Sequence, residues 1–361
     1  MAWLNDWFYD ILCGMKYVLD SRQVKPGMGF VALKGERVDG RDFIPAALAA
    51  GAAKVIEGLE ALQAEAREYR RSLKAKVIGV TGSSGKTTTK EFLKTFLHCY
   101  GTEGNYNNHI GLPMTILNCP ADEKFLVLEM GTSSPGEIAA LCDIAEPDVG
   151  LLVSLGSAHI EHFGSREAIE KEKMTLLGRA RDFGMRWDEV PPAPFDCPLP
   201  GEHNFSNMSL AYAAARRLGI DEATCRERLA GFSLPGQRWK KFEKGGVQFI
   251  DDSYNANPES MKAALDAFMA TPCKGRRIAV LGDMLELGEC AMERHREVFA
   301  YAAGLGIDVI IGTGKFSSQC KCSHSFKTLD ELKAQFWGIA SPGDLVLVKA
   351  SHSMRLGELV A

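Results

Sequence analysis

The stretch VIGVTGSSGKTT, residues 77–88, decides the fold of this chain. Its first four residues form a short apolar run, which is typical of a strand that is buried on both faces. A turn rich in glycine and serine follows, and residues 87–100 then place four large apolar side chains on one face of a predicted helix. A strand, a glycine-rich turn and a helix in this order predict one unit of a mainly parallel α/β sheet.

The turn itself, TGSSGKTT, is typical of a phosphate-binding loop. Glycines let backbone N–H groups curl around phosphate oxygens, and the helix N-terminus adds a partial positive charge. Lys86 can reach the β- and γ-phosphates, and the Thr87 hydroxyl can hold Mg²⁺. The loop is shorter than the GxxxxGK[ST] pattern, because Val80 stands where the first glycine would be. An unliganded turn is the alternative, but the context favours an ATP site made of Gly82, Ser83, Ser84, Gly85, Lys86, Thr87 and Thr88.

Outward from this loop, the chain divides into three α/β domains. Residues 1–75 contain one possible strand, and they end in a charged segment, 64–76, that we interpret as a solvated helix leading into a linker. Residues 76–234 hold the loop, further strands and a helix at 201–218, and a proline-rich connector at 191–200 interrupts them. Residues 235–361 contain four apolar runs and predict a Rossmann-like unit without a GxGxxG fingerprint.

Composition excludes several classes of protein. The chain has 361 residues, 46% of them hydrophobic, and a net charge of −4, so it is neither largely disordered nor a basic nucleic-acid binder. No apolar run approaches the roughly 18 residues of a membrane span, so we expect no membrane insertion. The N-terminus has no basic segment before its apolar residues, so we expect no signal peptide. The ten cysteines are then expected to be reduced in a cytoplasm.

Polar residues gather where predicted strands end, which is where open α/β sheets bind ligands. Glu129 closes the run FLVLE, and it is either a solvated strand end or a metal ligand. His159 follows the next strand and could bind a metal or cap a helical turn. Lys171 and Lys173 lie in EKEK, for which a solvated, salt-bridged helix face is the simplest interpretation. The segments GNYNNHIG, 104–111, and DDSYNANP, 251–258, could be turns, helix caps or polar binding loops.

Taken in order, these segments resemble the Mur ligase family of ATP-dependent amide-forming enzymes. The segments are TGSSGKTT, GNYNNHIGLP, VLEMG, SAHIEHFGS with EKEK, GEHNFSN, DDSYNANPES and GDMLELGE, and the resemblance runs from about Asp20 to the end. YNAN and GDMLELGE favour the branch that joins D-alanyl-D-alanine to UDP-N-acetylmuramoyl-tripeptide. The resemblance implies a UDP-substrate domain, a central ATPase domain and a Rossmann-like C-terminal domain.

The resemblance also implies roles for individual residues. Glu129 and His159 would bind Mg²⁺, and Lys173, rather than Lys171, would carry a carbamate that holds a second Mg²⁺. Arg238 would face the γ-phosphate. Positions near the adenine and ribose would be Asn204, Asn207 and Asp252, and positions near the other substrates would be Ser21, Arg22, Asn107, Asn108, Tyr254, Asn255 and Asn257.

The implied reaction serves peptidoglycan precursor synthesis, and hence cell wall biogenesis, cell shape and cell division. The substrate carboxylate would attack the γ-phosphorus of ATP, and the dipeptide amine would then attack the acyl phosphate. Two substrates held by different domains imply domain closure. We expect a monomer with two Mg²⁺ sites.

The chain departs from the family pattern in its central domain. Only residues 178–200 bridge Leu177 to the GEHN segment, so we expect a trimmed central sheet. His352 stands where an arginine would be expected. Two alternatives therefore stay open: another amide ligase of the superfamily, such as a folylpolyglutamate-type enzyme, and a non-catalytic protein that binds nucleotide or cell-wall precursor.

Overall fold

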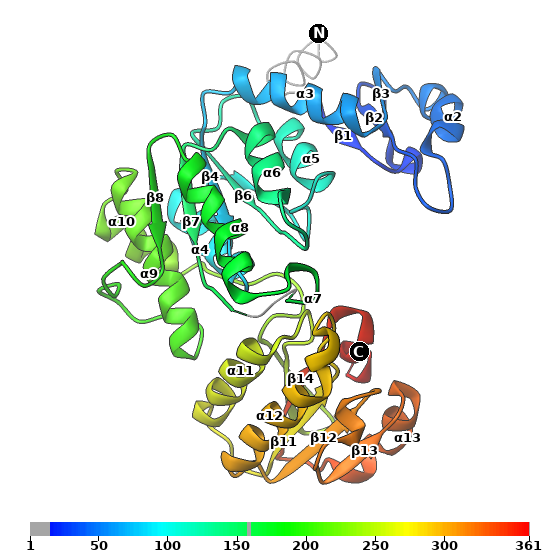
Figure 1. Ribbon diagram of the computed structural model, residues 1–361, viewed down its shortest axis with the longest axis vertical. Helices are drawn as coiled ribbons and strands as arrows, with labels where there is room; N and C mark the ends of the chain where they lie inside the picture. Colours follow the sequence, from blue (N-terminus) through cyan, green and yellow to red (C-terminus); the bar gives the residue numbers. More distant parts are fainter. Residues whose placement is uncertain (1–14, 157–159, 361) are drawn as a thin grey trace.

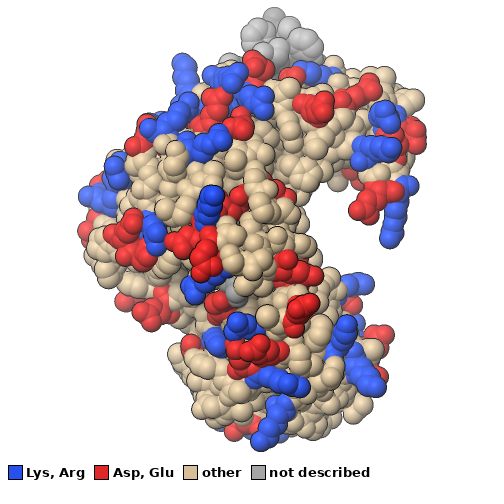
Figure 2. All heavy atoms as spheres, viewed as in Figure 1, with Lys and Arg blue, Asp and Glu red and all other residues tan. Residues whose placement is uncertain are grey.

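The computed structural model describes residues 15–156 and 160–360, and it contains three sheets in three lobes (Figure 1). The strands of the three sheets come from residues 17–57, 76–186 and 240–349. The predicted domain boundaries fall between these ranges, and we retain them as a proposal. Figure 2 shows a deep hollow between the N-terminal lobe and the C-terminal lobe. None of the helices in the described part of the chain has the length and apolar character of a membrane span.

The N-terminal lobe is a small parallel sheet in the order β1-β2-β3. Its strands are β1 (Tyr17–Val18), β2 (Gly29–Ala32) and β3 (Lys54–Glu57), with α2 (Ile44–Ala49) and the 3₁₀ turns η1 (Ser21–Gln23) and η2 (Gly40–Phe43). On one face of this sheet, Phe30 and four smaller apolar residues form a small core among the described residues, and on the other face Tyr17, Val31 and Ile56 join the core of the central lobe. Such a small core gives the lobe limited stability of its own.

The central sheet has five parallel strands in the order β5-β6-β4-β7-β8. The strands are β4 (Lys76–Thr81), β5 (Tyr100–Gly101), β6 (Phe125–Glu129), β7 (Val149–Leu152) and β8 (Phe183–Arg186). One face is covered by α3 (Leu59–Ser72), α5 (Gly111–Leu117), α6 (Glu137–Ala145) and α8 (Arg166–Arg179). The other is covered by α4 (Lys86–Leu97), α9 (Glu202–Arg217) and α10 (Glu222–Leu229), and α7 (Ile160–Phe163) precedes α8.

The alternation of side chains along these strands explains why both faces are apolar. In β6, Leu126 and Leu128 belong to the core under α5 and α6, whereas Val127 belongs to the core under α4 and α9. Successive side chains of a strand point to opposite faces, so a continuous apolar run is needed when both faces are covered. The expected parallel α/β fold is therefore confirmed in the central lobe.

The C-terminal sheet has six strands in the order β13-β12-β11-β14-β10-β9, and only the pair β9–β10 is antiparallel. The strands are β9 (Lys240–Lys244), β10 (Val247–Asp251), β11 (Arg277–Gly282), β12 (Val309–Thr313), β13 (His324–Phe326) and β14 (Leu345–Lys349). One face carries α11 (Pro258–Ala270) and α12 (Ala291–Gly304), and the other α13 (Leu329–Ile339) and η6 (Leu356–Leu359). Short 3₁₀ turns are η3 (Gly288–Cys290), η4 (Ser317–Gln319) and η5 (His352–Met354).

The prediction of a helix within residues 64–76 is confirmed, but the expectation that this helix is solvated was wrong for one of its faces. These residues belong mostly to α3, which packs against α5 and α6 and buries Leu62 and Ala66. Arg70 is also buried, and it donates hydrogen bonds to the carbonyl oxygens of Ala145 and Glu146 at the end of α6. The charged sequence concealed this because a buried arginine can satisfy the exposed carbonyl groups of a helix C-terminus.

Residues 178–200 contain an edge strand as well as the expected connector. Strand β8 pairs with β7, although its sequence, FGMR, has too little apolar character to predict a strand. The proline-rich part lacks regular structure, as expected, but Phe195 packs its ring edge-on against Phe96 of α4 and Tyr212 of α9. The segment therefore belongs to the hydrophobic core beside the site described below.

Candidate active site

The loop at residues 82–88 joins the carboxyl end of β4 to α4, as expected. Gly85 adopts a left-handed conformation, φ +81°, directly before the helix. A side chain there would lie 2.6 Å from Oδ1 of Asn207, so only glycine lets the loop pass this close to α9. The first-turn N–H groups of α4 are thereby left open toward the space in front of the sheet.

This space is a cleft of about 1270 Å³ between the central and C-terminal lobes. Most of the predicted site residues line it: Ser83, Ser84, Gly85, Lys86, Thr87, Thr88, Asn107, Asn108, Glu129, Asn204, Asn207, Arg238, Asp252, Tyr254, Asn255 and Asn257. Gly82 is not among the lining residues. The structure therefore brings together predicted site residues that are up to 174 positions apart in the chain, from Ser83 to Asn257.

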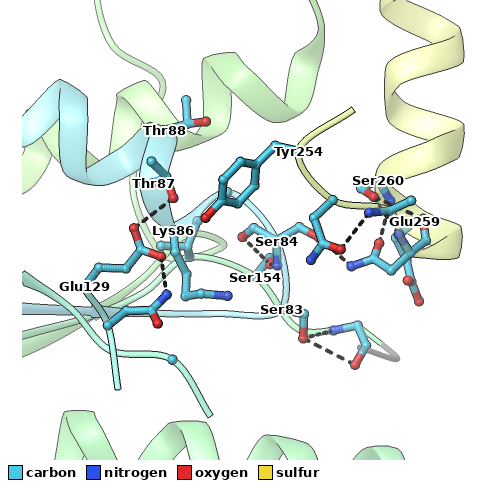
Figure 3. Close-up of a pocket in the computed structure, with 18 of the residues that line it drawn as sticks. Ser83, Ser84, Lys86, Thr87, Thr88, Glu129, Ser154, Tyr254, Glu259 and Ser260 are labelled. Carbon is cyan, nitrogen blue, oxygen red and sulfur yellow. Dashed lines mark hydrogen bonds between the residues drawn. The ribbon is translucent and has the colours of Figure 1, made fainter. Parts of the chain in front are cut away.

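Thr87 and Glu129 form the polar centre of the cleft. Glu129 ends β6 and is buried, and its Oε2 accepts a hydrogen bond of 2.8 Å from the Thr87 hydroxyl (Figure 3). Its Oε1 accepts a hydrogen bond of 2.9 Å from Nδ2 of Asn107. The alternative of a solvated strand end is excluded, because the carboxylate is buried and held on both oxygens.

A hydroxyl beside a carboxylate is a donor set that suits Mg²⁺. The ion prefers hard oxygen ligands, and in nucleotide sites it takes one or two from the protein and the rest from phosphates and water. No group of three or more His, Cys, Asp or Glu side chains able to hold a metal occurs within residues 15–156 and 160–360. His159, the other predicted ligand, lies outside the described residues.

Lys86 extends along the loop, and its Nζ donates a hydrogen bond of 2.9 Å to the carbonyl oxygen of Gly82. Burial lowers the pKa of its ammonium group; the carboxylate of Glu129 opposes this effect and the charge of Arg238 adds to it. Two cations, Lys86 and Arg238, thus interact around one anion, Glu129, and this arrangement fits a site that receives further negative charge.

Lys173 is buried, with 1% of its surface exposed, so the interpretation of EKEK as a solvated face was wrong for this residue. Burial and, to a smaller extent, the charge of Lys86 lower the pKa of its amine to about 7, against the opposing effect of Glu172. The neighbouring Glu172 is also buried, and it accepts hydrogen bonds from the N–H groups of Gly136 and Ile138 at the start of α6. Lys171, the other lysine of EKEK, is exposed, as the interpretation of a solvated helix face predicts. Lys173 is not among the residues that line the cleft.

The C-terminal lobe contributes the DDSYNANP segment, which follows β10. Asn257 caps α11 through a hydrogen bond from the N–H of Ser260, and its Nδ2 donates a hydrogen bond of 2.9 Å to Oγ of Ser84 (Figure 3). It is thus both a helix cap and a contact between the C-terminal lobe and the phosphate loop. Ser154 holds the same loop from the other side, because its hydroxyl accepts a hydrogen bond from the N–H of Ser84.

Arg238, Tyr254 and His352 form a stack at the wall of the cleft. The Arg238 guanidinium lies 3.7 Å from the centre of the Tyr254 ring, and the His352 ring lies 5.2 Å from the same ring. A cation over an aromatic face is stabilised by the ring quadrupole. The Tyr254 ring thereby helps to hold Arg238 at the wall of the cleft.

Lys349 is a site residue that the sequence analysis missed. It ends β14 and is buried, and its Nζ contacts Oδ2 of Asp252 at 2.6 Å and the carbonyl oxygen of Asn255 at 2.9 Å. The lysine thus holds both ends of the segment that carries Tyr254. Its place at the carboxyl end of an apolar run, LVLVK, is the signal that could have identified it.

The predicted substrate-binding roles of Ser21, Arg22 and Asn108 stay predictions, and the structure adds where these residues lie. Ser21 and Arg22 do not line the cleft; they lie in the N-terminal lobe, where the side chain of Arg22 is 86% exposed and paired with Asp20. Asn108 lines the cleft, but its Oδ1 accepts hydrogen bonds from the N–H groups of Ile110 and Gly111, so it also caps the start of α5.

Three family models match the chain. They describe the catalytic domain of the Mur ligase family at residues 17–95, the Mur ligase middle domain at 80–186, and the glutamate ligase domain of Mur ligases at 237–352.

Known proteins resemble the chain over nearly its whole length. UDP-N-acetylmuramoyl-tripeptide–D-alanyl-D-alanine ligase from Bacillus subtilis is 33% identical over 94% of this chain and 91% of its own, and the enzyme of that name from Synechocystis is 34% identical over 95% and 90%. The crystal structure of MurF ligase from Thermotoga maritima in complex with ADP matches with a TM-score of 0.83 and 30% identity, over 97% of each chain. The Bacillus alignment spans 418 residues, more than the 361 of this chain, so that relative has segments without a counterpart here.

Proposed function

This chain belongs to the Mur ligase family, and we propose that it joins D-alanyl-D-alanine to UDP-N-acetylmuramoyl-tripeptide while ATP is converted to ADP and phosphate. The observation that carries the proposal is the phosphate loop with its Thr87–Glu129 pair, which opens into a cleft closed on the other side by the DDSYNANP segment. A nucleotide and an acceptor can meet there. The product would be the pentapeptide precursor of peptidoglycan.

In the first step, the terminal carboxylate of the tripeptide attacks the γ-phosphorus of ATP and forms an acyl phosphate. The charge that develops on the phosphoryl oxygens needs fixed donors, because phosphoryl transfer is catalysed mainly by positioning and electrostatic stabilisation. Lys86 and the N–H groups at the start of α4 are placed for this role. Arg238, at the opposite wall, would supply a second cation.

Thr87 and Glu129 would hold Mg²⁺, which would neutralise phosphate charge when bound. A second Mg²⁺ would be held by Lys173 after its amine has reacted with CO₂ to give a carbamate. Support comes from its burial and from its lowered pKa, because only the neutral amine is nucleophilic. Carbamate formation replaces a buried cation by an anion that can be neutralised by metal.

In the second step, the neutral amine of D-alanyl-D-alanine attacks the acyl carbon, and phosphate leaves. Water would hydrolyse the acyl phosphate, so it has to be kept out while this happens. The contact of Asn257 with Ser84 supports closure of the C-terminal lobe over the phosphate loop as the means of excluding water. The monomeric state and a cytoplasmic location stay predictions.

The first test is phosphate release from Mg-ATP in the presence of bicarbonate. We expect release only when UDP-N-acetylmuramoyl-tripeptide and D-alanyl-D-alanine are both present. Lys173→Ala should abolish it, and Lys171→Ala, a matched change at an exposed position of the same helix, should not.

Other outcomes would redirect the assignment. Release that needs a different acid or amine would indicate another amide ligase of the superfamily. No release with any combination, in a protein that still binds ATP, would overturn the ligase proposal and favour a binding protein.

A further inference from the structure

Lys90 is a buried lysine that has no role in the proposed reaction. It lies on α4, one turn after Thr87, and none of its surface is exposed. Its Nζ donates a hydrogen bond of 2.7 Å to the carbonyl oxygen of Thr102 and lies 2.8 Å from Oε1 of Glu91. Burying an ammonium group is costly unless it is paired and hydrogen-bonded, so these contacts fix the position of the side chain closely.

Thr102 connects this lysine to the strand that carries Glu129. It follows β5 directly and is fully buried. Its N–H donates a hydrogen bond of 2.9 Å to the carbonyl oxygen of Val127, and its Oγ1 accepts one of 2.9 Å from the N–H of Glu129. Thr102 therefore contacts β6 on both sides of Leu128.

These contacts form a closed ring through two elements. The ring runs from Lys90 to Thr102, from Thr102 to Glu129, from the Glu129 carboxylate to the Thr87 hydroxyl, and back along one turn of α4. Apolar packing alone lets a helix slide over a sheet by a fraction of an ångström. The polar ring removes that freedom where α4 and β6 present their functional side chains.

We propose that Lys90 and Thr102 are positioning residues that set the separation of Thr87 and Glu129 for Mg²⁺. The inference rests on the proposed function, in which these two residues are the magnesium ligands. Mg²⁺ demands near-ideal octahedral geometry with short ligand distances, so a small displacement of α4 against β6 weakens its binding. Residues that orient metal ligands in this way typically change metal affinity 10–100-fold when they are replaced.

A purely structural role predicts a different result. A buried lysine that only stabilises the fold would, when replaced, lower the melting temperature without changing how nucleotide binding depends on magnesium. The decisive measurement is therefore the affinity for ADP by calorimetry over a series of Mg²⁺ concentrations, in the absence of the other two substrates. Thermal melting of the same samples reports the state of the fold.

Two pairs of variants isolate the two contacts. Lys90→Met removes the ammonium and keeps an unbranched chain of similar length, and Lys94→Met is its control. Lys94 is on the same helix and faces the same Glu91, at 3.6 Å, but it is partly exposed and lies outside the ring. Thr102→Val removes the hydroxyl that accepts from Glu129, and Thr102→Ser retains it.

For Lys90→Met and Thr102→Val we expect that ADP binding requires about tenfold more Mg²⁺ than in the unaltered protein. ADP binding without Mg²⁺ should be unchanged, and Lys94→Met and Thr102→Ser should behave as the unaltered protein does. An unchanged magnesium requirement in both altered proteins would overturn the inference. If Lys90→Met does not unfold cooperatively, the Thr102 pair decides by the same criterion.

The unaltered protein separates this inference from the proposed function. If its own ADP binding is insensitive to Mg²⁺, the assignment of Thr87 and Glu129 as ligands fails, and the positioning role fails with it. If its ADP binding depends on Mg²⁺ and the variants match it, only the positioning role fails.

Discussion

At the scale of single residues, Lys173 shows how burial and a neighbouring charge can prepare a side chain for chemistry. Burial and, to a smaller extent, the charge of Lys86 lower the pKa of its amine to about 7. At pH 7 a lysine in water is almost fully protonated, and the protonated amine does not react with CO₂.

The carbamate on Lys173 should therefore depend on pH. We expect its ¹³C signal, in protein equilibrated with ¹³C-bicarbonate, to rise from about pH 6 to about pH 8 as the amine loses its proton. Lys173→Arg should lack the signal, and Lys171→Ala should retain it. A signal that is present in Lys173→Arg, or that is absent at every pH, would contradict the assignment.

The same shift affects stability in the uncarbamylated protein. In the unfolded chain Lys173 keeps its proton up to the ordinary lysine pKa of about 10.5, whereas in the folded chain its pKa is about 7. Between these values the unfolded state binds more protons, so this residue makes the free energy of unfolding increase as pH rises.

At position 85 the phosphate loop requires glycine, because the backbone is left-handed there and neighbouring side chains lie close. We expect Gly85→Ala to lower the free energy of unfolding by about 2 kcal/mol, because a left-handed alanine costs roughly 1–2 kcal/mol and its Cβ would meet Asn207 and Val153. ADP binding should weaken as well, because the loop must move. Denaturant unfolding and ADP calorimetry measure the two effects.

Gly104→Ala is the matched control for this change. Gly104 is also left-handed, φ +54°, but no atom lies within 4 Å of the position where its Cβ would be. It should show only the cost of the backbone conformation and normal ADP binding. Equal losses of ADP affinity in the two variants would contradict the argument from close approach.

At the scale of the element, a buried arginine adds a polar anchor to the apolar packing of helix α3 on the central lobe. Arg70 donates hydrogen bonds to two carbonyl oxygens at the end of α6 and forms an ion pair of 3.0 Å with Asp148. Asp148 also accepts a hydrogen bond from the N–H of Val77, at the start of the strand that leads to the phosphate loop. The helix after the N-terminal lobe is thereby joined to the base of the ATP-binding unit.

Arg70→Met should destabilise the protein by about 3 kcal/mol, because it leaves the partly buried carboxylate of Asp148 and two carbonyl groups without this donor. Urea unfolding followed by circular dichroism measures the loss. Arg71→Met, at the next position, should cost less than about 1 kcal/mol, since its ion pairs with Glu68 and Glu146 are at the surface and its side chain is 53% exposed. Similar losses in the two variants would show that Arg70 does not anchor the helix.

At the scale of the whole molecule, the cleft lies between the central and C-terminal lobes, and the proposed reaction requires them to approach each other. Asn257 contacts both lobes. Its side-chain oxygen caps α11 in the C-terminal lobe, and its amide nitrogen donates a hydrogen bond to Ser84 of the phosphate loop in the central lobe. We expect X-ray scattering to show a smaller radius of gyration when a non-hydrolysable Mg-ATP analogue and UDP-N-acetylmuramoyl-tripeptide are both bound.

Asn257→Ser should reduce this contraction. Serine keeps a helix-capping oxygen, so α11 should keep its stability, but it lacks the amide that reaches Ser84. Ser260→Ala is the control, because it removes the other half of the capping box and leaves the contact between the lobes. If Ser260→Ala impairs closure as much as Asn257→Ser, the effect belongs to the helix cap.

Much of the fold follows from local patterns in the sequence. The strands at 77–80 and 125–130 and the helix at 87–100 were predicted because continuous apolar runs and 3.6-residue periodicity are local signals. Strand β8 and the packing of α3 were missed, because a polar edge strand and a charged helix owe their places to partners far away in the chain.

The sequence by itself determined the phosphate loop, the order of the α/β units and the family, because glycine spacing, apolar periodicity and ordered motifs are properties of the chain read along its length. Only the tertiary structure decided which lysines are buried and what they contact. Lys173 and Lys171 look alike in EKEK, and Lys90 and Lys94 look alike in one helix, yet one of each pair is buried and the other lies at or near the surface. The physical reason is that desolvation and pairing of a charge depend on every element packed around it, and those elements come from distant parts of the sequence.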